Sequence, residues 1–65
     1  MLVKLSLKHS DGSTEPIWVN PERVIWVQSQ PGGTVVTIDA AGKKELLGVE
    51  GTADAVAKLL NVKAH

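Results

Sequence analysis

The sequence predicts an α+β fold: a five-stranded antiparallel β-meander, either open or barrel-like, followed by one C-terminal α-helix. Three observations predict it. Residues 1–49 hold five short runs of alternating or β-branched residues, separated by clusters rich in Gly, Pro and Asp. Apolar residues at helical spacing appear only after Gly51. The 65 residues leave room for one small domain, spanning residues 1–65.

The first two strands are predicted to form a hairpin. Residues 2–8 alternate apolar and polar side chains, which is typical of a half-buried strand. Asp11-Gly12 lies in the following polar cluster and favours a tight turn. Residues 15–19 form the second strand. Pro16 cannot donate to a ladder, so this strand is expected at an edge or paired only from Ile17 onward.

A short turn should separate the second and third strands. The Asn20 side chain can cap the backbone that follows, and Pro21 presets the dihedral angle of a first helical position. We therefore expect a single 3₁₀-like turn over residues 20–23. Residues 24–29 are apolar on both faces, which favours a strand in the middle of the sheet.

The last two strands follow glycine-containing turns. Residues 34–39 are rich in β-branched side chains and follow Pro31-Gly32-Gly33. The fifth strand is predicted over residues 44–49, with Gly48 as a bulge or a point of close backbone approach.

One helix is predicted from Ala53 to about Val62. Thr52 is a suitable N-cap, and Asp54 in the first turn suits the helix dipole. A helix this short needs to dock on the sheet to persist in water. The predicted core then contains Val3, Leu5, Leu7, Val36, Ile38, Leu47, Val56 and Leu60.

Composition narrows the possible functions. The chain has no cysteine, and its two histidines, His9 and His65, lie at opposite ends. Seven basic and seven acidic residues give zero formal charge, whereas nucleic-acid binders carry a cationic surface. We therefore expect no metal, no cofactor, no nucleic-acid partner and no membrane span. Without a signal-peptide pattern, a cytoplasmic location is the default.

One polar cluster invites a catalytic interpretation. His9, Ser10, Asp11, Ser13 and Glu15 gather at the first hairpin tip. Catalysis needs such groups in a fixed and partly dry geometry, which an exposed tip does not provide. Ser, Asp and Gly are ordinary turn residues, so we expect turn chemistry and assign no catalytic residue.

The two tryptophans are the best candidate for a binding surface. If the second and third strands pair across the turn, Trp18 lies opposite Trp26 on one face. Exposed indoles are typical of interfaces, so we expect a homo-oligomer, most simply a dimer. The candidate interface residues are Trp18, Trp26, Val24 and Gln28. The alternative is that the helix covers this face and makes both indoles part of the core.

Several short motifs resemble one protein family. They are Val19–Ile25, Thr34–Ile38, Gly42-Lys43, and Val49-Glu50 leading into Ala55–Ala57. In this order they resemble the small flagellar-operon proteins called FlbD. The resemblance implies a bacterial protein that supports flagellar function without a defined chemistry, and no catalytic residue. The chain departs from the pattern at residues 10–16, where its hairpin is longer, and in its two tryptophans.

A second resemblance suggests another class. Residues 24–62 are similar to the β-rich end of LytTR-type DNA-binding domains, which read DNA from basic loops. Here those loop positions are Gln28, Ser29, Gln30, Asp39, Ala40 and Ala41. The first prediction is therefore a non-enzymatic, self-associating interaction module with an unidentified protein partner. The alternative is a small nucleic-acid-binding regulatory module.

Overall fold

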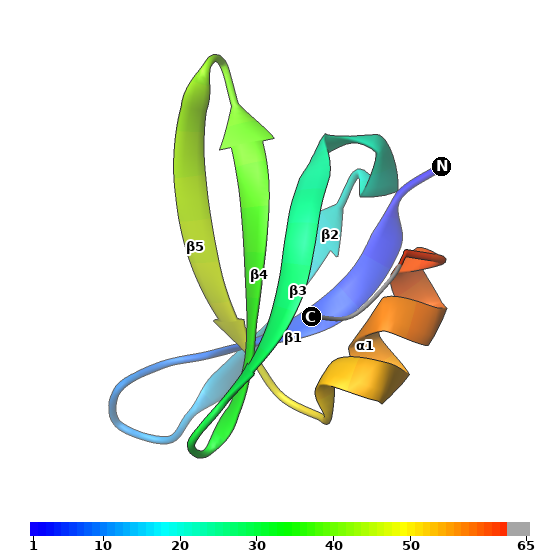
Figure 1. The fold of residues 1–65 in the computed structure, drawn as a ribbon. Coiled ribbons are helices and arrows are strands. Elements are labelled where there is room, and N and C mark those ends of the chain that lie inside the picture. The colour runs from blue at the N-terminus through cyan, green and yellow to red at the C-terminus, as the bar shows by residue number, and fades with distance from the viewer. Residues whose placement is uncertain (63–65) are drawn as a thin grey trace.

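The computed structural model describes residues 1–62, and they form five strands, a 3₁₀ turn and one helix (Figure 1). The elements in chain order are β1 (Val3–Lys8), β2 (Thr14–Val19), η1 (Pro21–Arg23), β3 (Val24–Gln30), β4 (Gly33–Ala40), β5 (Lys43–Val49) and α1 (Ala53–Leu60). The predicted class, five antiparallel strands with one C-terminal helix, is confirmed.

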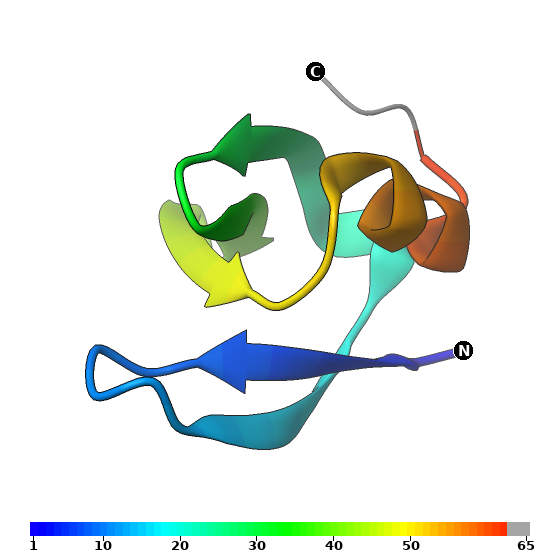
Figure 2. The same ribbon diagram turned by 90° about the horizontal axis from the view of Figure 1, so that it is seen from below.

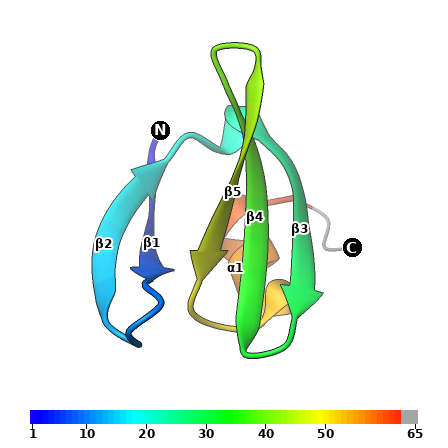
Figure 3. The same ribbon diagram turned by 90° about the vertical axis from the view of Figure 1, so that its left-hand side faces the viewer.

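The order of the strands differs from a meander. The sheet runs β2-β1-β5-β4-β3, so β2 and β3 lie at opposite edges (Figure 3). The prediction of a simple meander was wrong, and so was the central position of β3. The chain leaves β2 through η1 and crosses to the far edge, while β1 pairs with β5. Because β2 and β3 do not pair, the sheet stays open.

The sheet consists of a β1–β2 hairpin and a β3–β4–β5 meander joined at one end. β1 and β5 share a single register pair, Leu7 with Val49. Two hydrogen bonds reinforce this end. The Glu50 amide donates to the Ser6 carbonyl at 3.0 Å, and Lys8 Nζ donates to the Gly32 carbonyl at 2.9 Å. The two parts therefore meet near the turns that precede β2, β4 and α1.

Helix α1 covers one face of this open sheet. It contacts β3, β4 and β1, and Figure 2 shows it on the open side between β3 and the β1–β2 hairpin. The buried apolar side chains between helix and sheet are Leu5, Val19, Val27, Val36, Val49, Val56, Ala57 and Leu60. Of the other predicted core residues, Val3, Ile38 and Leu47 are partly buried against this cluster and Leu7 is half-buried.

The predicted caps are present. Thr52 Oγ1 accepts a hydrogen bond from the Ala55 amide at 3.2 Å, and Asn20 Oδ1 accepts one from the Glu22 amide at 3.0 Å. The helix ends at Leu60, two residues before the predicted end, because Asn61 adopts the left-handed conformation with φ 59°. That conformation stops helical hydrogen bonding and is a common helix ending.

The bulge lies in a different strand from the one predicted. β5 pairs with β4 in unbroken register through Gly48, so the predicted bulge there was wrong. The register instead shifts in β3, between Val24 and Trp26. The extra residue, Ile25, changes which β3 side chains face the core. Val24 and Val27 both point inward as a result, although three positions separate them.

Candidate functional site

The side of the β3–β4–β5 meander opposite α1 carries one continuous row of side chains. Trp26 of β3 pairs with Thr37 of β4, and Thr37 pairs with Leu46 of β5. The next row on the same face contains Gln28, Val35 and Gly48. Figure 3 views the sheet from this side, with α1 behind it. We call Trp26, Gln28, Val35, Thr37 and Leu46 the outer patch.

Two large apolar side chains of the outer patch are exposed to solvent. The exposed fraction is 42% for Trp26 and 71% for Leu46, and Gln28 is also exposed. Strand alternation explains the position of Leu46, because Leu46 and Leu47 are neighbours and only Leu47 can face the core. The meander therefore presents apolar surface on both sides, with the helix on one of them.

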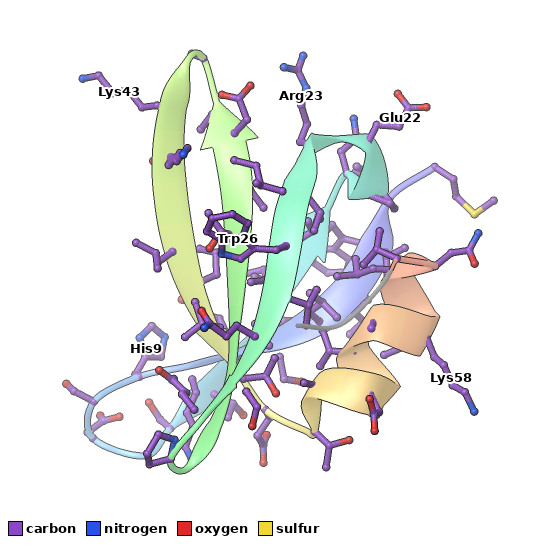
Figure 4. All side chains as sticks on the ribbon, in the orientation of Figure 1. His9, Glu22, Arg23, Trp26, Lys43 and Lys58 are labelled. Atoms are coloured by element: carbon purple, nitrogen blue, oxygen red, sulfur yellow. The ribbon has the colours of Figure 1, made fainter. Side chains whose placement is uncertain are left out.

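The Trp26 ring lies across β4. Lys44 Nζ is 5.8 Å from the centroid of the Trp26 ring, and Lys44 belongs to β5, two strands away from β3. Figure 4 shows the Trp26 side chain in front of β4. Thr37 is the β4 residue directly opposite Trp26, and only 3% of it is exposed. A residue on the outer face is therefore buried between Trp26 and Leu46, its register partners on β3 and β5.

Thr37 is buried without a hydrogen bond. Its Oγ1 has no partner, whereas Thr34, which is also buried on β4, donates from Oγ1 to the Gly51 carbonyl at 2.8 Å. Burying an unpaired hydroxyl costs free energy, because the group loses its hydrogen bonds to water. Thr37 is therefore a locally unfavourable residue at the centre of the outer patch.

Replacing Thr37 by valine should stabilise the monomer. Thr37→Val keeps the shape and removes the unpaired hydroxyl, so we expect the free energy of unfolding to rise by about 1 kcal/mol. Thr34→Val is the matched control, since it deletes a bonded hydroxyl and should lower the same quantity by about 1 kcal/mol. Urea denaturation at low protein concentration measures both. A loss of stability in Thr37→Val would show that the hydroxyl is satisfied.

The predicted interface residues do not come together as expected. Trp18 lies on β2 opposite Lys4 and is 59% exposed, while Trp26 lies on β3 at the other edge of the sheet. The predicted pairing of Trp18 with Trp26 was therefore wrong. Val24 packs against the core, and Gln28 belongs to the outer patch. The alternative that α1 covers both indoles was also wrong, because the helix packs on the opposite face.

Three members of the outer patch were not predicted as site residues: Val35, Thr37 and Leu46. Leu46 follows two lysines and a glutamate, and it could have been recognised because two adjacent leucines in a strand cannot share a face. Thr37 had no such signal. Its position opposite Trp26 depends on the bulge at Ile25.

The hairpin tip shows ordinary turn chemistry. Asp11 Oδ1 accepts hydrogen bonds from the Ser13 hydroxyl at 2.6 Å and the Ser13 amide at 2.8 Å. The Ser13 hydroxyl, and then the amide, lower the pKa of the Asp11 carboxyl. His9 Nε2 lies 2.9 Å from Glu15 Oε1, and the two side chains are 43% and 55% exposed. Residues 1–62 contain no group of three potential metal ligands, and His65 lies outside the described residues.

Comparison with known proteins gives no match from which a function could be inferred. The chain matches no family model, no curated protein and no solved structure. Within residues 1–62, helix α1 has only eight residues, and no helix is both long and apolar enough to cross a membrane.

Proposed function

We propose that the protein is a non-enzymatic interaction module that self-associates through the outer patch. One observation carries the proposal: Trp26 and Leu46 remain 42% and 71% exposed on a sheet face opposite the helix. Exposed apolar side chains gathered on one face are typical of interaction sites, and tryptophan is enriched among residues that dominate binding energy. The resemblance of residues 19–25 and 34–38 to FlbD proteins further supports an accessory role of the flagellar type.

Charge supports a second copy as the partner. The five residues of the outer patch are uncharged, and the two ionisable residues next along the same face, Asp39 and Lys44, have opposite signs. The whole chain has zero formal charge, so two copies do not repel one another at long range. A nucleic-acid partner is not part of the proposal, because phosphate binding depends on a surplus of cations.

The size of the outer patch predicts weak association. Three strands about 4.8 Å apart and five residues long cover on the order of 250 Å². Stable interfaces bury at least about 1,200 Å² in total. The area that two such patches can bury together is well below that value. We therefore expect a reversible dimer with a dissociation constant in the micromolar range or weaker, in a cytoplasmic setting.

Sedimentation equilibrium between about 10 µM and about 1 mM covers the range of such weak dimers. The wild-type mass should rise with concentration above the 6.9 kDa of one chain. Leu46→Gln should keep the protein monomeric by removing apolar surface from the patch. Leu59→Gln is the matched control, because Leu59 is a 60% exposed leucine on α1. A wild type that stays monomeric throughout would refute the proposed function.

A further inference from the structure

We propose, building on the proposed self-association, that Gln28 of a second copy supplies the missing hydrogen-bond partner of the Thr37 hydroxyl. The dimer is then two-fold symmetric, and each copy contributes both a Gln28 and a Thr37 to the contact. The outer patch becomes a specific interface with one reciprocal polar contact at its centre.

The starting point is the unpaired hydroxyl. Thr37 is 97% buried on a face that α1 does not cover, and the residues paired with it on the two neighbouring strands are Trp26 and Leu46. Leu46 can move without breaking the sheet ladder, because it is largely in solvent. The Trp26 ring has Lys44 Nζ 5.8 Å from its centroid, so a second copy that reaches Thr37 has to displace a ring that already has a partner. Buried polar groups in proteins nearly always have a hydrogen-bond partner. We infer that the partner of the Thr37 hydroxyl belongs to another molecule.

Gln28 fits the role of that partner. It lies on the same face as Thr37, one row along β3 from Trp26, and its side chain is exposed. Within residues 1–62 its side-chain carboxamide makes no hydrogen bond. An amide donates and accepts, so it can bond a hydroxyl in either direction. Facing sheets lie about 10 Å apart, a gap that a glutamine and a threonine side chain can bridge together.

Two-fold symmetry explains why the partner is another copy of this chain. In such an interface, a contact of residue i with residue j is repeated as a contact of j with i. Thr37 and Gln28 occupy adjacent strands and adjacent rows, so one axis between β3 and β4 brings each hydroxyl near the opposite amide. The Trp26 ring then turns aside from Thr37 and packs against the second copy.

A double-mutant cycle on the dimer dissociation constant tests the contact. Thr37→Val and Gln28→Ala should each weaken dimerisation about tenfold, because each removes both symmetry-related bonds. The double variant should also weaken dimerisation about tenfold relative to the wild type, because the two residues contribute to the same hydrogen bond. Thr37→Ser keeps the hydroxyl and should restore near-wild-type affinity. The melting temperature of each monomer checks that every variant is folded.

The outcomes separate this inference from the proposed function. A wild type that dimerises while Thr37→Val dimerises equally well would overturn the Gln28–Thr37 contact and leave self-association intact. Effects of Gln28→Ala and Thr37→Val that simply add, to about a hundredfold, would also overturn it. A wild type that never dimerises would overturn both. Coupled losses with rescue by Thr37→Ser would establish the contact.

Discussion

Leu60→Ala should unfold much of the protein at room temperature. Leu60 is the largest fully buried side chain, with 1% of its surface exposed, and it holds α1 against the sheet. Truncating a buried leucine costs about 2–5 kcal/mol, because apolar contact is lost and a cavity remains. A domain of this size rarely has more than about 3–5 kcal/mol of stability in total. Urea denaturation followed by far-ultraviolet circular dichroism measures the loss.

Leu59→Ala provides the matched control. The two leucines are neighbours on α1, but Leu59 is 60% exposed. Its truncation should change the free energy of unfolding by less than about 0.5 kcal/mol, as for most surface substitutions. If the two variants lost the same stability, α1 would not be docked through the face that carries Leu60.

Gly33→Ala should produce the second large effect. A Cβ atom at Gly33 would lie 3.1 Å from the carbonyl oxygen of Val49, which belongs to the backbone of the adjacent strand β5. The oxygen can move only if the ladder moves, so we expect a loss of about 1–3 kcal/mol, as for other overpacked sites. Thermal unfolding should show a lower midpoint for this variant.

Gly48→Ala tests whether the close approach is specific to Gly33. Its Cβ would lie 4.0 Å from the Lys8 carbonyl oxygen, an ordinary contact distance. This glycine lies in β5 and does not need a left-handed backbone. Alanine should therefore be tolerated, and its lower conformational freedom in the unfolded chain should offset any small clash. A greater loss for Gly48→Ala than for Gly33→Ala would contradict the assignment of the tight contact.

The elements could be predicted from the sequence because their signals are local. Alternation in residues 2–8, the Asn20-Pro21 turn and the Thr52 cap each act over a few residues, and each is present in the structure. The strand order could not be predicted in the same way. It depends on β1 pairing with β5 rather than β2 pairing with β3, and no short pattern specifies contacts so far apart along the chain.

The candidate site was only partly predictable for a related reason. Trp26 and Gln28 were expected on an exposed face because they are two residues apart in a strand. Val24 was expected beside them, but the bulge at Ile25 turns it toward the core. Val24, Ile25, Trp26 and Val27 are all apolar, so side-chain type gives no indication of which residue is the extra one.

The single register pair between β1 and β5 has a consequence for aggregation. Within residues 1–62, the edge of β5 away from β4 pairs with another strand only at Val49. An open backbone edge can template the addition of foreign strands and so start cross-β assembly. The exposed start of this edge is Lys43-Lys44-Glu45, and parallel in-register stacking of identical chains would place like charges one above another. These three charged residues therefore act as gatekeepers for an edge that the sheet leaves uncovered.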